Sequence, residues 1–279
     1  MSSDRVFRSA LALTIAALAA CRAGEPAKDA AAGGTNEVTV TARDYAFDAP
    51  ATVPAGLTTF HLVNKGPSLH HLQLIKLDEG KTGDDYVAAL KAGGPPPPWA
   101  SLAGGPNPPE PGSTTTATVS LEPGDYAIVC FVPGADGMPH LMKGMVHPVK
   151  VVGPSRAGAE PAADIVMKLV DFDFQLSAAL PAGRHTIRVE NAGSQPHEVA
   201  IIRMQPGRTP EDFAAWAEKM SGPAPGALFG GMTGIMPGAH AFAIVDLPAG
   251  DYALMCFFPD GKDGKPHFAH GMMKMIKVS

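Results

Sequence analysis

The chain has 279 residues, of which 45% are hydrophobic, 18% are charged and only 6% are aromatic, and its formal net charge is −5. This length is typical of two ordinary domains, and the apolar content is sufficient for each to bury a core. The negative net charge argues against a nucleic-acid-binding protein, which would carry a basic patch or stripe. The 31 Gly and 28 Pro residues indicate a loop-rich β protein.

The first 21 residues have the pattern of a targeting segment, which is excluded from reasoning about the fold. Two arginines precede an apolar stretch at about 10–20, which is too short to span a membrane. The sequence Leu-Ala-Ala-Cys at 18–21 resembles the lipobox of bacterial lipoproteins, so Cys21 is the expected lipidation site. Residues 22–36 form a flexible tether of mostly small residues. We therefore expect a lipid-anchored protein outside the cytoplasmic membrane, in the periplasm.

The rest of the chain carries one pattern twice. The register is kept by pairs that lie 126 or 127 positions apart, namely Asn64 and Asn191, His70 and His197, Cys130 and Cys256, His140 and His267, and Met145 and Met272. Self-similarity held over some hundred residues indicates two copies of one structural unit. We predict one domain at 37–152 and a second at 164–279, joined by a linker at 153–163.

Each copy has the pattern of short strands between Gly- and Pro-rich turns. The strands expected in the first copy are 37–42, 58–63, 71–77, 116–121, 126–130 and 148–152, and those in the second are 164–170, 185–190, 197–203, 241–247, 252–256 and 273–278. One helix is expected in each copy, at 82–92 and 209–220, with Thr82 and Thr209 as N-caps. Loops are expected at 93–112 and 221–238. The predicted fold class is all-β, with two tandem β-sandwiches and one inserted helix in each.

Strand alternation decides which of two adjacent histidines faces the core. His70 shares a strand face with Leu72 and Leu74. His71 shares the opposite face with polar Gln73, so we expect His71 to point outward. By the same alternation, His197 of the second copy faces the core, because it shares a strand face with Val199 and Ile201.

Cys130 and Cys256 each end a core strand, at the same point of each copy. Cysteines in an oxidising compartment usually pair, but a Cys130–Cys256 disulfide would require two equivalent buried strand ends to face each other. Metal ligation explains why two such thiols stay unpaired. One thiolate, two imidazoles and one thioether are the ligands of a mononuclear blue-copper site.

Three motifs resemble the cupredoxins, the family of plastocyanin, azurin and rusticyanin, and they occur in both copies. They are the Asn-x-Gly-x-x-x-His strand, the Gly-Asp-Tyr-x-x-x-Cys strand and the His-x4-Met ending. The resemblance implies a Greek-key β-sandwich in each copy, with a Cys and two His around one copper and a Met as weak axial ligand. The ligands that it implies are His70, Cys130, His140 and Met145 in the first copy and His197, Cys256, His267 and Met272 in the second.

One feature departs from the family, in which the Cys and the loop His are usually two to four residues apart. Here nine residues intervene in the first copy and ten in the second. Met142 and Met273 are therefore alternative axial groups, and His270 is an alternative imidazole.

These ligands predict a one-electron carrier that exchanges electrons with a cytochrome, an oxidase or a reductase. Two alternatives are a lipoprotein that stores or delivers Cu(I) and a metal-free interaction module. Multicopper oxidases and copper nitrite reductases need further histidines, usually as His-x-His or His-Cys-His, and neither pattern occurs in the chain. The sequence therefore predicts that the protein is not an enzyme.

Overall fold

The structure, a computed structural model, describes residues 1, 34–93, 95–154 and 158–279. Residues 33–279 form one compact unit. The targeting segment, Cys21 and most of the tether lie outside the described residues, as do three residues of the linker. Among the described residues, no helix is long and apolar enough to cross a membrane.

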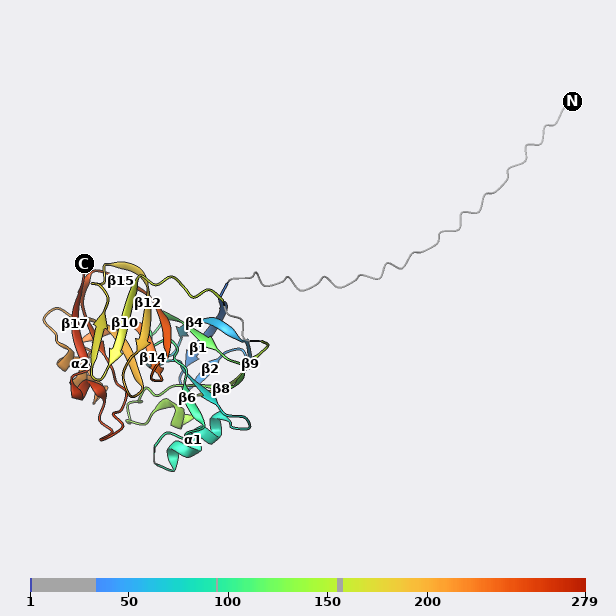
Figure 1. Ribbon diagram of the computed structural model, residues 1–279, viewed down its shortest axis with the longest axis horizontal. Coiled ribbons are helices and arrows are strands. Elements are labelled where there is room, and N and C mark those ends of the chain that lie inside the picture. The colour runs from blue at the N-terminus through green and yellow to red at the C-terminus, as the bar shows by residue number, and fades with distance from the viewer. Residues whose placement is uncertain (2–33, 94, 155–157) are drawn as a thin grey trace. The chain divides into compact units, whose positions relative to one another are not determined.

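The strands and helices follow the same order in both copies, which we call repeat 1 and repeat 2 (Figure 1). Repeat 1 contains β1 (Asn36–Arg43), β2 (Ala46–Asp48), β3 (Thr52–Pro54), β4 (Gly56–Asn64), β5 (Gln73–Leu77), α1 (Gly83–Lys91), β6 (Ala100–Leu102), β7 (Thr114–Leu121), β8 (Gly124–Val129), the 3-10 turn η1 (His140–Lys143) and β9 (Val146–Val152). Repeat 2 contains β10 (Ile165–Val170), β11 (Asp173–Leu176), β12 (Gly183–Asn191), β13 (His197–Met204), α2 (Pro210–Ala217), β14 (Gly226–Ile235), β15 (His240–Leu247), β16 (Gly250–Met255), the 3-10 turn η2 (His267–His270) and β17 (Met273–Val278). The twelve expected strands are all present, with ends within two residues of the predicted ones.

Each repeat is a β-sandwich, and the two sandwiches share a sheet. An eight-stranded sheet has the order β11-β10-β12-β15-β7-β4-β1-β2, so half of it belongs to each repeat. The halves join where β15 pairs antiparallel with β7, with Ala243 opposite Ala117. The second layer is β3-β9-β8-β5-β6 in repeat 1 and β14-β13-β16-β17 in repeat 2. This confirms the all-β sandwich fold. The predicted domain limits stay a prediction.

The core lies between the two layers of each sandwich, and the cysteines lie within it. In repeat 1, Val40 and Phe60 from the shared sheet pack in one cluster with Leu74 and Ile128 from the second layer. Cys130 belongs to the same cluster and is fully buried. Alternation along β8 thus carries the thiol into the core at the end of the strand.

Both inserted helices begin at the predicted threonine. The Thr82 hydroxyl accepts a hydrogen bond from the Asp85 backbone N–H at 3.1 Å, and an Asp85 carboxylate oxygen accepts one from the Thr82 N–H at 2.9 Å. The same reciprocal capping box links Thr209 and Asp212 at the start of α2. Each box satisfies two backbone donors that a helix leaves free, so the expected N-caps are confirmed.

The expectation of a loop at 221–238 is wrong, because this segment contains the ten-residue strand β14. The glycines of this segment were interpreted as residues that interrupt strands. In the structure they instead allow the backbone of β14 to pack closely against its neighbours. A Cβ at Gly231 would lie 2.0 Å from the Val199 carbonyl oxygen of the neighbouring β13. The strand also pairs with repeat 1, since isolated bridges join Ala103 to Ile235 and Pro106 to Met232. Pairing with a segment more than 120 residues away leaves no local signal in the sequence.

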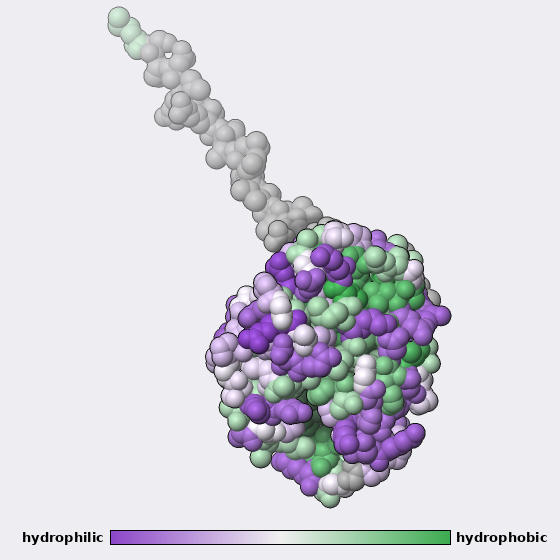
Figure 2. All heavy atoms as spheres, turned by 90° about the vertical axis from the view of Figure 1, so that its left-hand side faces the viewer, coloured by the Kyte–Doolittle hydropathy of each residue, from purple (hydrophilic) through white to green (hydrophobic). Residues whose placement is uncertain are grey.

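Polar and apolar side chains are interspersed over the face shown in Figure 2. Among the described residues beyond Met1, the large apolar side chains that are exposed are Met138, Val152, Met236 and Met275. Three of these four are methionines, and they lie in different parts of the chain. The methionines expected as axial ligands, in contrast, are fully buried.

Candidate metal centres

The loop before the first ligand histidine is shaped by Asn64. Its side-chain oxygen accepts a hydrogen bond from the Gly66 N–H at 2.9 Å, and its amide nitrogen donates to the Ser68 carbonyl at 2.8 Å. Asn191 makes the corresponding bonds in repeat 2, at 3.0 Å from the Gly193 N–H and 2.9 Å to the Gln195 carbonyl. The Asn of the Asn-x-Gly motif therefore fixes the turn that places the histidine.

An aspartate holds the outer nitrogen of each of these histidines. Asp44 Oδ1 lies 2.7 Å from His70 Nε2, and His70 is fully buried. Because a carboxylate accepts, Nε2 carries the proton and the lone pair of Nδ1 is left free to bind a metal. A Cβ at Gly66 would lie 2.7 Å from the same Asp44 oxygen and 3.0 Å from the same imidazole nitrogen, so glycine leaves room for the pair.

Repeat 2 reproduces the pair. Asp171 Oδ1 hydrogen-bonds to His197 Nε2, and a Cβ at Gly193 would lie 2.5 Å from both atoms. The two aspartates were missed in the sequence. Their positions differ by 127, like those of the ligand histidines, so a register comparison extended to acidic residues would have found them.

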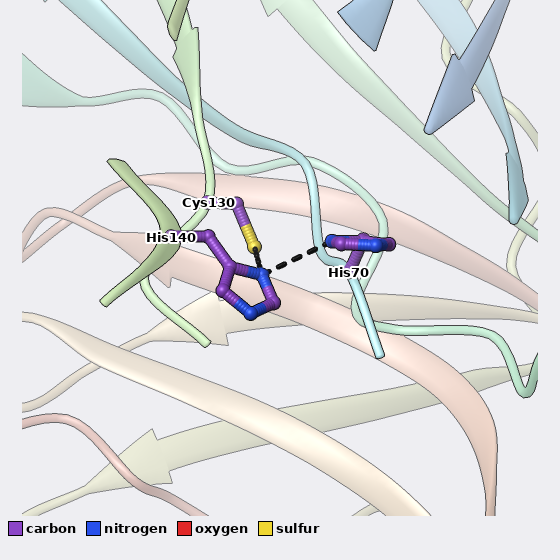
Figure 3. Close-up of side chains that lie close together, drawn as sticks. All are labelled: His70, Cys130 and His140. Carbon is purple, nitrogen blue, oxygen red and sulfur yellow. Dashed lines mark hydrogen bonds between the residues drawn. The ribbon is translucent and has the colours of Figure 1, made fainter. Parts of the chain in front are cut away.

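Three donor atoms converge in repeat 1, as Figure 3 shows. His70 Nδ1 lies 3.1 Å from His140 Nδ1, which lies 3.6 Å from the Cys130 sulfur. All three atoms lie within 4.8 Å of one another, and the three residues are buried. Ligand atoms that share one ion through bonds of about 2.0–2.3 Å are separated by about 3–4 Å, so the donors fit a single metal ion.

Repeat 2 brings together the equivalent atoms. The Nδ1 atoms of His197 and His267 lie 2.9 Å apart, and the sulfur of Cys256 lies 3.4 Å from the latter. The residues expected as trigonal ligands thus form two buried groups of the same geometry. One sulfur and two imidazole nitrogens suit copper, since soft sulfur favours Cu(I) and imidazole also binds Cu(II).

The long Cys–His loops fold back on themselves. In repeat 1, Pro133 pairs with Pro139, the His140 N–H donates to the Val132 carbonyl at 3.0 Å, and the Leu141 N–H donates to the Cys130 carbonyl at 2.8 Å. In repeat 2 a bridge between two prolines and the corresponding backbone bonds close the loop in the same way. The extra residues therefore form a closed loop, and the histidine that follows them still lies next to the cysteine.

The expected axial methionines lie on the same side as the cysteines. Met145 is fully buried in the core cluster that contains Cys130, and its N–H donates to the His140 carbonyl at 3.1 Å. Met272 is likewise buried in the cluster with Cys256. The alternative axial groups pack against other clusters, Met142 near Leu141 of repeat 1 and Met273 against the corresponding cluster of repeat 2.

Burial keeps the ligands uncharged before a metal binds. Burial, together with a smaller contribution from the neighbouring His70, lowers the pKa of His140 to about 4. The pKa of His267 is lowered to about 4 in the same way, by burial and by His197. Burial raises the pKa of the Cys130 thiol to about 12. The imidazole lone pairs are therefore available at neutral pH, whereas the thiol must lose its proton to a metal.

The expectation that His71 points outward is wrong. Its side chain lies on the face opposite the metal ligands, but the ring is buried and packs edge-on against Phe131, with the ring centroids 6.0 Å apart. His71 Nε2 accepts a hydrogen bond from the Phe131 N–H at 2.8 Å. At the equivalent position of repeat 2, Glu198 Oε1 accepts one from the Phe257 N–H at 3.0 Å. Alternation gave the correct face, but that face is covered by other parts of the fold at His71.

The alternative imidazole, His270, lies outside the buried groups. Its Nε2 is 3.2 Å from Asp263 Oδ1, and these two residues form a partly exposed group with Asp260. Asp260 is already engaged, because it accepts hydrogen bonds from Gln195 Nε2 and from the Lys262 N–H. His270 therefore does not join the ligands of repeat 2.

No family model matches the chain, and no curated protein matches it either. Solved structures do align with it. Auracyanin from Roseiflexus castenholzii is 22% identical and aligns over all of its own chain and 43% of this one, with a TM-score of 0.29. The fold is cupredoxin-like. At identities below 25% the likeness concerns the fold, and one blue copper protein corresponds in length to one repeat.

Larger copper proteins align with both repeats. A copper nitrite reductase from Nitrosomonas europaea is 17% identical over 88% of this chain and 94% of its own, with a TM-score of 0.27. A blue copper oxidase from the same organism is 16% identical over 88% of this chain and 86% of its own, with a TM-score of 0.25.

This corrects the prediction that the protein is not an enzyme, which is wrong. The prediction rested on the missing His-x-His and His-Cys-His patterns, but the copper nitrite reductase and the blue copper oxidase align with most of the chain. The physical reason is that ligands need not be adjacent in sequence. Here the fold gathers His, Cys and His from segments that lie 10 to 70 residues apart.

Proposed function

We propose that the protein is a membrane-tethered periplasmic copper protein that transfers single electrons through a type 1-like copper site in each repeat. The observation that carries the proposal is the convergence of two imidazole Nδ1 atoms and one thiol sulfur within 4.8 Å, in buried groups that occur twice. Bound copper would supply a couple that changes by one electron. His70, Cys130, His140 and Met145 would hold it in repeat 1, and His197, Cys256, His267 and Met272 in repeat 2.

The residues around each group favour a site that changes little between oxidation states. Asp44 fixes the tautomer and the ring orientation of His70 through its 2.7 Å contact. The backbone bonds that close the loop fix His140 relative to Cys130. Both ligand nitrogens are held before metal arrives, and a mixed sulfur and nitrogen donor set accepts both Cu(I) and Cu(II). Rapid electron transfer requires that the ligands move little when the metal changes its oxidation state.

The tether and the partner are further parts of the proposal. The segment at 1–21, which ends in the lipobox-like Cys21, supports export and lipidation, and residues 22–36 would separate the copper repeats from the membrane. The exchange partner would be a cytochrome, an oxidase or a reductase. The anchor is tested by labelling cells with a radioactive fatty acid, because Cys21→Ser should abolish the label and release the protein from the membrane fraction.

The copper chemistry is tested by adding Cu(II) to the metal-free protein. The proposal expects strong visible absorption from the thiolate–copper bond, its loss on reduction with ascorbate and its return on oxidation. Cys130→Ser and Cys256→Ser should each remove one part of the absorption, and the double variant should remove all of it. Tight Cu(I) binding without reversible colour would favour copper storage instead. Absence of copper binding would overturn the proposal.

A further inference from the structure

The residues inserted between each cysteine and its loop histidine contribute an aspartate that the function proposed above leaves unexplained. Asp136 of repeat 1 and Asp263 of repeat 2 lie 127 positions apart, like the ligand histidines. Asp136 Oδ1 lies 2.8 Å from Lys143 Nζ, and Asp263 Oδ1 lies 3.2 Å from His270 Nε2. Lys143 and His270 are also 127 positions apart, and each lies three residues after a loop histidine. In both repeats the insert is therefore joined to the 3-10 turn that carries the loop histidine.

In repeat 1 the ring of Tyr45 contacts both the loop histidine and the lysine. The Tyr45 centroid lies 4.9 Å from that of His140, at an interplanar angle of 67°, and 4.8 Å from Lys143 Nζ. Lys143 Nζ also donates a hydrogen bond to the Tyr45 hydroxyl at 3.4 Å. Tyr45 directly follows Asp44, which holds His70, in the turn between β1 and β2. One turn thus contacts both ligand histidines of repeat 1.

Repeat 2 keeps this arrangement, although two of the residue types differ. Phe172 directly follows Asp171, and its ring centroid lies 5.0 Å from that of His267. The Phe172 ring also stacks on the imidazole of His270, with the centroids 5.1 Å apart and an interplanar angle of 29°. Phenylalanine thus replaces tyrosine and histidine replaces lysine, but the order of ligand imidazole, aromatic ring, nitrogen-bearing side chain and carboxylate stays the same.

The outer nitrogen of each loop histidine is closed off from water. His140 is 1% exposed, and among the described residues its buried Nε2 and that of His267 have no hydrogen-bond partner. A neutral imidazole that binds a metal through Nδ1 carries its proton on Nε2, which would readily donate to water. Leaving a buried donor unpaired costs stability. Stability alone therefore does not explain why an aromatic ring, rather than water, lies against each loop histidine.

We propose that these side chains form a cover in each repeat, which positions the loop histidine and keeps water from the metal. The cover consists of Tyr45, Lys143 and Asp136 in repeat 1 and of Phe172, His270 and Asp263 in repeat 2. The proposal deepens the function proposed above and rests on it. The aromatic ring holds the imidazole, the nitrogen-bearing side chain holds the ring, and the aspartate of the insert holds that side chain. Since exposed ion pairs add little to stability, the aspartate acts by fixing the position of the cover.

The first test needs no copper and measures how fast a water-soluble maleimide reacts with one thiol at a time. The full chain has three cysteines, so Cys21→Ser with Cys256→Ser leaves only Cys130, and Cys21→Ser with Cys130→Ser leaves only Cys256. Tyr45→Ala should raise the Cys130 rate by about tenfold or more, because the site then opens locally with less cost. The same substitution should leave the Cys256 rate unchanged, and Phe172→Ala should have the reverse effect.

This crossed design separates loss of a cover from general destabilisation, which would raise the rates of both thiols. Tyr45→Phe puts the residue of repeat 2 into repeat 1 and should keep the low rate. Asp136→Asn removes the charge of the insert but keeps the oxygen that accepts the Met138 N–H at 3.1 Å. It should raise the Cys130 rate by about threefold, the effect of losing one exposed ion pair. Equal rates in the parent and Tyr45→Ala, or parallel increases at both thiols, would overturn the cover.

The second test uses copper-loaded protein, with azide as the probe of access to the metal. In the Cys256→Ser background, the parent and Tyr45→Phe should keep their visible absorption when azide is added. Tyr45→Ala should instead gain a new band from azide bound to the copper of repeat 1. An azide band of equal strength in the parent would overturn the cover. Failure of these proteins to bind copper would count against the proposed function, whereas the thiol rates test the cover without it.

Discussion

Asp44 Oδ1 lies 2.7 Å from Nε2 of the fully buried His70, and this contact orients the nitrogen on the other side of the ring toward Cys130. Asp171 and His197 repeat the relationship in the second metal-binding group. A carboxylate that accepts from the outer nitrogen of a ligand histidine fixes its tautomer and raises its basicity. The aspartates are therefore positioning residues for the metal.

Replacing Asp44 by Ala should weaken copper binding in repeat 1 by about 10–100-fold, the range that loss of such a partner typically causes. The reason is that His70 Nε2 loses its acceptor and Nδ1 is no longer reserved for the metal. The measurement is a copper titration followed by visible absorption. It is made in the Cys256→Ser background, so that only repeat 1 contributes colour.

Asp48, an exposed carboxylate on β2, provides the control for the charge change. Asp48→Ala should leave the titration as it is in the background protein. Equal affinities in the Asp44 and Asp48 variants would show that the contact with His70 has no role in holding copper.

Gly66→Ala should disturb the contact between Asp44 and His70 while leaving both residues in place. The new Cβ would lie 2.7 Å from Asp44 Oδ1 and 3.0 Å from His70 Nε2, so one of them must move. We expect weaker copper binding in repeat 1 and a shifted visible band. Gly34→Ala is the matched control, because no atom lies within 4 Å of its Cβ position. A Gly66→Ala protein with unaltered colour and affinity would contradict the close packing.

Copper binding should release about one proton per site at neutral pH. The Cys130 thiol, with its pKa raised to about 12 by burial, is protonated in the metal-free protein, whereas His140, with its pKa lowered to about 4, is not. The apparent affinity should therefore rise about tenfold per pH unit between pH 6 and 8, and its dependence should steepen in acid as the imidazoles protonate. Calorimetry in buffers of different ionisation enthalpy measures the release. A value near two or three protons at pH 7 would mean that the histidines are charged before copper binds.

Much of the fold was predictable because each repeat supplies local signals. Alternating apolar residues give the strands, and Thr82 with Asp85 gives the start of a helix. The second copy then provides an independent check on the first. The sequence analysis missed strand pairing that has no local signal, as in β14. Gly231 of this strand packs against Val199, and isolated bridges also join the strand to a segment of the other repeat.

The residues that bind the metal in the candidate site were predictable from the sequence, but the residues that support them were not. Register and alternation selected His70 over His71, and the fold brings the selected histidine to Cys130. Asp44 was missed because it lies 26 residues before its partner, with no motif that links the two. The burial of His71 was missed because it depends on tertiary contacts, such as the one with the Phe131 ring. Residues that support a ligand act through tertiary contacts, which strand periodicity does not report.

The central claim, two copper centres of equal construction, is tested most directly by crystals of the copper-loaded protein. An anomalous difference map recorded at the copper absorption edge locates each ion without assumptions about its ligands. The account predicts two peaks, one within bonding distance of the Cys130 sulfur and of Nδ1 of His70 and His140, the other at the equivalent atoms of repeat 2. Peaks at other residues, copper bound through the Nε2 atoms, or the absence of either peak at full loading would contradict it.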